Sequence, residues 1–224
     1  MKHWIVGAWS VLEKDLRLEF RTRYALNLLL MFVITCLLVV SLAVGREPVT
    51  PSMTTGLLWI VVLFSAAIGL GRSFLAEEDG GTTLILRLHL RGSQVYAGKL
   101  AFTFLLLLAV DVVATAGFVF LLEMNVAAAG LLALVLGTGS LGLAAATTLL
   151  SAIIARASNR GPLLPVLAFP VLFPLLLTIV PAARAALDGG GGFEAAAGDL
   201  RVIVAFAGTL ITGAVMLFDY IWED

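Results

Sequence analysis

Long apolar runs, separated by short polar stretches, fill most of the chain. Six of these runs are long enough to cross a bilayer core, which takes about 20 helical residues. They cover residues 24–44, 56–74, 97–122, 127–154, 162–180 and 202–222. Continuous apolar runs, rather than ten-residue alternating segments, exclude a transmembrane barrel and leave helices as the spanning structure. The pattern therefore predicts an all-α membrane protein with six transmembrane helices.

Residues 2–23 show a different pattern, in which apolar and basic positions alternate with helical spacing. The apolar side chains recur every three or four residues: Trp4, Ile5, Ala8, Trp9, Leu12, Leu16 and Phe20. The basic side chains fall mainly between them: Lys14, Arg17, Arg21 and Arg23. This is typical of an amphipathic helix, and beside a membrane span such a helix is expected to lie in the interface plane. We therefore expect residues 1–23 to form an interfacial helix. The alternative, a helix packed on a soluble core, is disfavoured because the sequence offers no such core.

Composition supports the same class. Hydrophobic residues make up 61% of the chain and charged residues 13%, against about 45–50% and about 25% in soluble domains. Residues 1–224 therefore form a single transmembrane domain. The net charge of -1 gives no indication of nucleic-acid binding, and the single cysteine, Cys36, lacks the spacing of a metal site.

The basic residues set an orientation. With six spans and a cytoplasmic N-terminus, only Arg46, Arg184 and Arg201 of the 14 Lys and Arg residues fall outside. This positive-inside bias predicts cytoplasmic N- and C-termini, a cytoplasmic loop at residues 71–96 and a periplasmic loop at residues 181–201. Trp59 and Trp222, near the ends of their spans, are expected to be interfacial anchors.

No catalytic motif is visible. The nearest match to a phosphate-binding loop, from Gly92 to Lys99, has one residue too many between its glycines and lacks the following Ser or Thr. No HExxH, GxSxG or paired-cysteine motif occurs. The sequence predicts a non-catalytic subunit with no cofactor or metal bound directly, so any energy for transport must come from a partner.

Two kinds of feature inside the spans are candidates for function. Asp111 lies in the third span, where a carboxylate is costly and faces the bundle interior or water; it is either a substrate or proton site or an interior carboxyl bonded to a neighbouring helix. Pro165, Pro170 and Pro174 in the fifth span predict kinks that either line a substrate path or serve plain packing. His3 and His89 have no second ligand at useful spacing and are not expected to bind haem or metal.

Four blocks of sequence resemble one known family. The first is Trp59 with the run 64–74, and the second is the acidic-Gly-Thr-Leu pattern of Glu77, Glu78, Gly81, Thr83 and Leu84. The third combines 136–141 with 150–153, and the fourth, 160–176, is the most specific. Together they resemble CcmB, the ABC-2-type haem exporter permeases of bacterial cytochrome c maturation. The chain departs from the family at His89–Gly92, where a proline is usual, and after Pro181 it offers little to match.

The resemblance implies an inner-membrane permease subunit, present as a homodimer in a complex. Its expected partners are the ATPase CcmA, which binds ATP and Mg, together with CcmC, CcmD and the haem chaperone CcmE. The complex would use ATP to export haem or to release the haem-loaded CcmE, with haem as its substrate or cargo. ATP hydrolysis would act on a short cytoplasmic element at about residues 77–90, which makes the following residues candidates for ATPase coupling: Arg72, Glu77, Glu78, Gly81, Leu84, Leu86 and Leu88.

Two questions stay open at this stage. Residues 84–91 alternate between apolar and other side chains, which is typical of a strand, whereas the resemblance favours a short helix or helical turn. The alternative functions are an ABC-2 permease for a lipid, drug or polysaccharide, and a membrane scaffold that transports nothing.

Overall fold

A computed structural model describes residues 2–45, 49–70, 88–155, 163–188 and 192–223. Within these ranges the chain is helical almost throughout and contains no strand. The long helices are α1 (Lys2–Thr22), α2 (Tyr24–Val44), α3 (Pro51–Leu70), α6 (Gly92–Leu121), α7 (Ala129–Ala155), α8 (Leu163–Asp188) and α9 (Gly192–Glu223). In this part of the chain, all of these except α1 are long and apolar enough to cross a membrane. The described residues confirm the prediction of a helical fold with six candidate spans.

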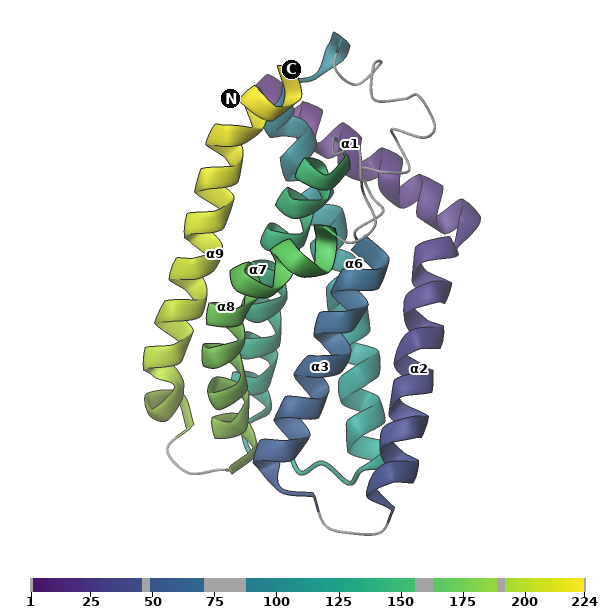
Figure 1. Cartoon of the computed structure of the whole chain (residues 1–224), viewed down its shortest axis with the longest axis vertical. Coiled ribbons are helices and arrows are strands. Elements are labelled where there is room, and N and C mark those ends of the chain that lie inside the picture. Colours follow the sequence, from purple (N-terminus) through teal and green to yellow (C-terminus); the bar gives the residue numbers. More distant parts are fainter. Residues whose placement is uncertain (1, 46–48, 71–87, 156–162, 189–191, 224) are drawn as a thin grey trace.

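The six candidate spans lie side by side, and α1 lies across one end of the bundle (Figure 1). Both termini lie at that same end (Figure 1). An even number of spans requires this placement, because each span carries the chain to the opposite end of the bundle.

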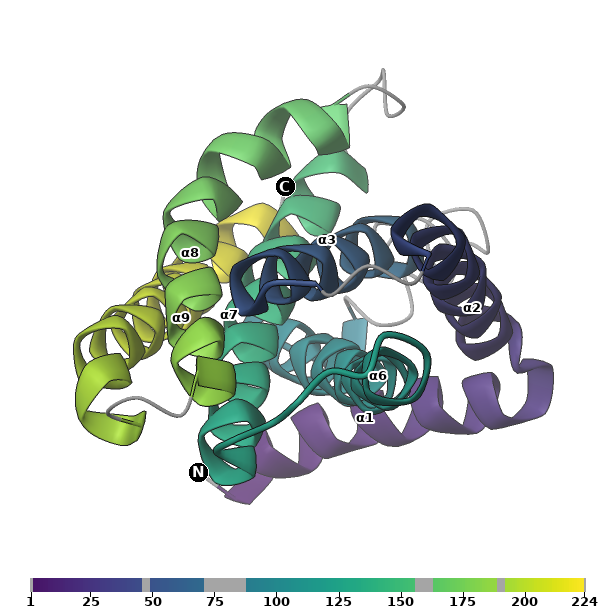
Figure 2. The same cartoon turned by 90° about the horizontal axis from the view of Figure 1, so that it is seen from below.

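Helix α7 lies among α6, α8, α9 and α3, as the view along the bundle shows (Figure 2). Its small residues allow this central position. A β-carbon added at Gly142 would lie 3.1 Å from Leu175 of α8, and one at Gly139 would lie 2.5 Å from the Trp59 ring of α3. The small residues of this helix therefore serve packing between helices of the same chain.

Trp59 corrects a prediction. It was expected to anchor the chain at the membrane interface, but its side chain is 1% exposed and lies in the core. The reason is Gly139, whose missing side chain leaves room for the indole ring between helices.

Residues 181–201 also depart from the prediction of a long periplasmic loop. Helix α8 continues to Asp188 and α9 begins at Gly192, so most of this segment is helical. Alanine is the strongest helix former, and the segment is alanine-rich. Ala182, Ala183 and Ala186 are fully buried, and the Ala186 carbonyl accepts a hydrogen bond of 2.9 Å from the Ala128 amide. The hydrophobic pattern did not predict the last turns of α8 and the first turns of α9, because short alanine side chains contribute little hydrophobicity.

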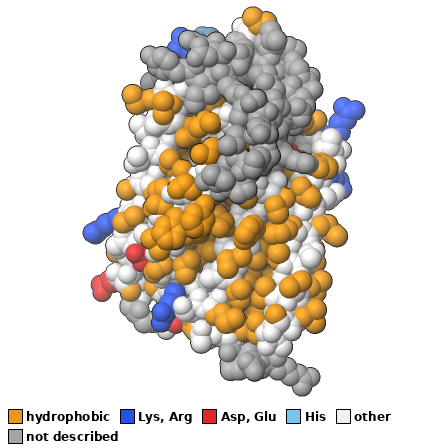
Figure 3. All heavy atoms as spheres, in the orientation of Figure 1, with side chains coloured by type: hydrophobic (Ala, Val, Ile, Leu, Met, Phe, Trp, Pro, Cys, Tyr) orange, Lys and Arg blue, Asp and Glu red, His pale blue; other side chains and the backbone are white. Residues whose placement is uncertain are grey.

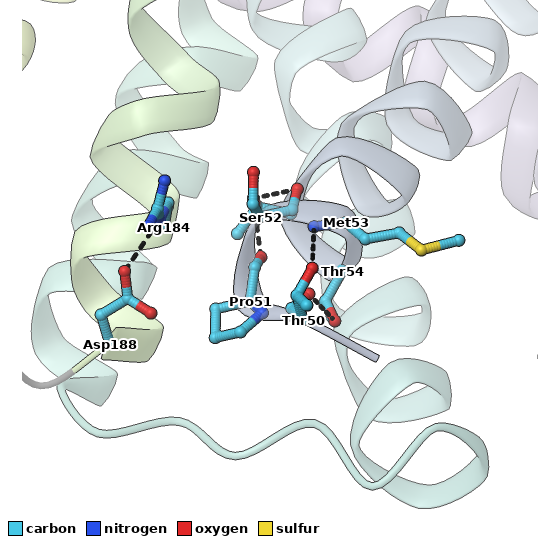
Figure 4. Close-up of polar contacts among 8 residues, drawn as sticks. Thr50, Pro51, Ser52, Met53, Thr54, Arg184 and Asp188 are labelled. Carbon is cyan, nitrogen blue, oxygen red and sulfur yellow. Dashed lines mark hydrogen bonds and ion pairs between the residues drawn. The ribbon is translucent and has the colours of Figure 1, made fainter. Parts of the chain in front are cut away.

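At this end of the bundle, α3 starts beside the end of α8 (Figure 4). Thr50 precedes α3, and its hydroxyl accepts a hydrogen bond of 3.3 Å from the Met53 amide. Pro51 occupies the first helical position, where its missing N–H is not needed. Arg184 and Asp188 form an ion pair of 2.8 Å one helical turn apart at the end of α8.

Apolar side chains cover much of the middle of the surface shown in Figure 3. In the described part of the chain, large exposed apolar residues occur on every candidate span, for example Leu42, Ile60, Val112, Leu134, Leu177 and Met216. In water such a surface would be a large apolar patch, but it suits contact with lipid.

Candidate functional site

Most of the residues predicted to couple to an ATPase lie outside the described residues: Arg72, Glu77, Glu78, Gly81, Leu84 and Leu86. Leu88 is described and is 76% exposed. It lies with His89 in a helical turn, and residues 84–87 of the alternating stretch lie outside the described residues.

The predicted loop at residues 71–96 ends earlier than expected. Helix α6 begins at Gly92, and the residues from Gly92 to Tyr96 already lie within it and are largely buried. The Gln94 side chain explains this start, because its Oε1 accepts a hydrogen bond of 3.0 Å from the Arg91 amide. That amide would otherwise lack an intrahelical partner at the helix end.

The first turn of α6 is also bonded to α1. Gln94 Nε2 donates to the His3 carbonyl oxygen at 3.2 Å, and Trp4 Nε1 donates to the Ser93 hydroxyl at 3.2 Å. Thus the start of α6 is fixed by α1 and by its own cap together.

Glycines bring the two helices into close contact. A β-carbon at Gly98 would lie 2.6 Å from the Ala8 carbonyl oxygen and 2.6 Å from the Val11 β-carbon. A β-carbon at Gly7 would lie 2.7 Å from Gln94 Nε2. Only glycine fits at Gly98 without movement of the α1 backbone.

A buried ion pair lies one residue beyond Gly98. Lys99 Nζ is 3.3 Å from Asp15 Oδ2, and the side chains are 1% and 9% exposed. Lys14 Nζ contacts the other oxygen of Asp15 at 3.1 Å. Asp15 therefore bridges a cation on α6 and a cation on its own helix.

The outer surface of α1 carries apolar and aromatic side chains. Ile5, Trp9 and Phe20 are 57%, 63% and 70% exposed. Val11 and Leu12 face inward and are buried. The sequence pattern predicted one apolar face on this helix. The structure divides its apolar residues between two faces, one packed on α6 and one turned outward.

A sharp turn joins α1 to α2. Arg23 has the left-handed backbone conformation (φ 52°, ψ 24°), which is uncommon for a residue with a side chain. The buried Glu19 carboxylate accepts hydrogen bonds from the Leu26 amide (2.7 Å) and the Ala25 amide (3.3 Å). A negative charge at the start of a helix is favourable because the helix dipole is positive there.

Asp111 on α6 faces α7 inside the bundle. It is 2% exposed, and its Oδ2 accepts a hydrogen bond of 2.7 Å from the Ser140 hydroxyl. Its other oxygen has no hydrogen-bond partner among the described residues. The geometry is that of a polar link between two helices, one of the two alternatives that the sequence left open.

Two prolines of the fifth span, Pro170 and Pro174, lie on the outer face of α8. Pro170 and Pro174 are exposed, and the side chain of Pro165 lies outside the description. Figure 1 shows the upper part of α8 turning away from its lower part, as expected where proline removes backbone hydrogen bonds. The two described kinks therefore face away from the interior of this chain.

The described residues include no group of three His, Cys, Asp or Glu side chains that could hold a metal ion. What the geometry does provide is a continuous set of polar links: α1 to α6, α1 to α2, and α6 to α7. Sequence reasoning missed the Asp15–Lys99 pair. The sequence did contain a signal for this pair. Gly98 and Lys99 are adjacent near the start of the third predicted span, where a glycine allows close helix contact and a lysine needs a partner.

Comparison with known proteins identifies a family and a similar protein. The model of the CcmB protein family matches residues 6–219 of the chain. A similar protein is the heme exporter protein B of Bradyrhizobium diazoefficiens. It is 29% identical over 189 residues, which cover 83% of this chain and 85% of that protein.

Proposed function

Because this chain belongs to the CcmB family, we propose that it is the permease subunit of a haem-export complex in cytochrome c maturation. The observation that carries the proposal is the family match over residues 6–219, which includes all six candidate spans apart from the last turn of α9. The similar protein from Bradyrhizobium diazoefficiens is named as a heme exporter. These matches favour haem over a lipid, drug or polysaccharide as the cargo, and export over a scaffold role.

The subunit transmits energy and does not hydrolyse ATP. The partner ATPase, CcmA, binds ATP and Mg, and the complex includes CcmC, CcmD and the chaperone CcmE, whose haem-loaded form it releases. The coupling element is the segment at about residues 77–90, and the proposed contact residues are Arg72, which precedes it, and Glu77, Glu78, Gly81, Leu84, Leu86 and Leu88 within it. Ligand-driven movement of the ATPase pushes this segment and shifts the spans against one another.

The membrane arrangement follows from the same proposal. The chain is a multi-pass protein of the bacterial inner membrane, with both termini cytoplasmic and α1 in the interface. The exposed face of Ile5, Trp9 and Phe20 supports this position, since aromatic side chains favour the headgroup region.

Two copies of the chain would serve two ATPase subunits. Pro170 and Pro174 face outward on α8, so any path that these kinks line, with Pro165, runs between copies and not through one chain. Asp111 acts as a link between α6 and α7 in each copy.

The test is purification of the tagged full-length chain from membranes in a mild detergent. An ATPase subunit is expected to copurify, and ATP hydrolysis is expected in the purified complex. Leu84→Asp and Glu77→Lys are expected to lower ATPase recovery about tenfold, since loss of an interface contact costs about 1–3 kcal/mol. Ser10→Asp, an exposed position on α1, serves as the control and retains the ATPase.

Two outcomes would contradict the proposal at different levels. If no ATPase accompanies the unmodified chain, it is not a subunit of this kind of transporter. If ATPase recovery is normal with both variants, the segment at residues 77–90 is not the contact.

A further inference from the structure

Buried charges gather around α1. Among the described residues, four charged side chains are buried: Asp15, Glu19, Lys99 and Asp111. The first three make the contacts by which α1 holds its neighbours, Asp15 with Lys99 on α6 and Glu19 with the first amides of α2. Helix α1 is thus fixed at the start of two spans.

A buried ion pair is an unusual choice for stability alone. Removing two charges from water is costly, and an apolar pair of similar size often packs as well or better. An ion pair instead restricts how the two helices align, because any alignment that separates the partners leaves an unpaired buried charge. The Asp15–Lys99 pair therefore fixes the register of α1 on α6 more strictly than apolar packing would.

The contacts along α1 are continuous. Near its start, Trp4 and Gly7 contact Ser93 and Gln94 in the first turn of α6. In its middle, Ala8 and Val11 contact Gly98. These contacts precede the ion pair, and the link from Glu19 to α2 follows it.

We propose that α1 and the first turns of α6 form one rigid unit, registered by the Asp15–Lys99 pair, that carries movement from the start of α6 to the start of α2. This inference rests on the proposed function, because the segment that leads into α6 is the proposed ATPase contact. Helix α1 is then a transmission element as well as a membrane-surface helix. Asp15 and Lys99 are positioning residues and do not contact the cargo.

The experiment uses the full complex carrying Asp15→Asn or Lys99→Met. ATP hydrolysis by the complex and mature cytochrome c in cells are measured, and their ratio is the readout. We expect hydrolysis to stay close to that of the unmodified complex, while mature cytochrome c falls about tenfold, a typical size for the loss of coupling between sites. A purely structural role would lower both together, through loss of the complex, and leave the ratio unchanged.

The exchange variant, Asp15→Lys with Lys99→Asp, made together with Lys14→Gln, restores an ion pair between α1 and α6 without placing two lysines side by side. It is expected to recover most of the mature cytochrome c that either single change loses. Glu13→Gln is the matched control, because Glu13 pairs with Arg17 on the exposed side of the same helix; its ratio should not change.

An unchanged ratio in both single variants, or an exchange variant no better than them, would overturn the inference. Loss of the ATPase from the unmodified complex would instead overturn the proposed function, so the two failures are distinguishable.

Discussion

At the scale of single residues, the link between Asp111 and Ser140 is the clearest polar contact inside the bundle. The bond joins α6 to α7 at 2.7 Å, and both side chains are almost fully buried. Inside a membrane, a buried carboxyl that lacks a hydrogen-bond donor from the protein cannot bond to water instead. The bond therefore compensates part of the cost of placing Asp111 inside the bundle.

We predict that Ser140→Ala lowers the free energy of unfolding by about 0.5–2 kcal/mol, the range of hydrogen bonds between membrane helices. Asp111→Asn should cost less, because an amide oxygen can accept the same bond from Ser140. It should also leave cytochrome c maturation intact. Thermal unfolding of the detergent-solubilised variants measures the first effect and the level of mature cytochrome c the second.

Adding Asp111→Leu to Ser140→Ala serves as the control, since removing both polar partners should cost less than removing one. Loss of cytochrome c maturation by a stably folded Asp111→Asn variant would show that the carboxylate itself has a functional role.

An interior carboxyl was one of the two alternatives that the sequence left open at Asp111, and the sequence did not identify its partner. Ser140 stands in a run of small residues on α7, and nothing in its spacing distinguishes it from Ser151 or Thr147. The pairing depends on how α6 and α7 align, and hydrophobic pattern does not fix that alignment. Trp59 failed for a related reason, because its burial depends on a glycine 80 positions later in the chain.

At the scale of helices, Glu19 holds the turn between α1 and α2. Among the described residues, its side chain is the one that accepts hydrogen bonds from the first amides of α2. We predict that Glu19→Ala loosens the first turn of α2 and lowers stability by about 1 kcal/mol, a typical value for the loss of a helix cap. Hydrogen exchange of the Ala25 and Leu26 amides measures the local effect.

Glu13→Ala is the comparison for this change, because Glu13 is an acidic residue on the exposed side of the same helix. Its effect on the exchange of these two amides should be negligible. Equal exchange in the two variants would mean that Glu19 does not hold the turn.

Helix boundaries were less predictable than the helices themselves. Apolar content identified all six spans because lipid contact demands it over most of each helix. It placed the start of the third span at residue 97, whereas α6 begins at Gly92. The additional turn depends on the Gln94 cap and on hydrogen bonds to α1, and neither leaves a signal in the hydrophobic pattern.

At the scale of the whole molecule, charge separates the two ends of the bundle. Lys14, Arg17, Arg21 and Arg23 lie on α1 or directly after it, at the end that holds both termini. The opposite end has Arg184 and Arg201 together with Asp188, Glu194 and Asp199. These basic residues of α1 therefore lie at the end of the bundle that the sequence predicts to be cytoplasmic.

The orientation can be tested with single cysteines in a Cys36→Ser background. We predict that Glu194→Cys, at the start of α9, reacts with a membrane-impermeant maleimide added to intact spheroplasts, because this end of the bundle faces outward under the positive-inside rule. Glu13→Cys, on the exposed side of α1, should react only after the membrane is permeabilised. Since the two positions lie at opposite ends of one bundle, labelling in the reverse order would place the termini outside. The start of α6, which lies at the same end as the termini, would then be out of reach of any cytoplasmic ATPase.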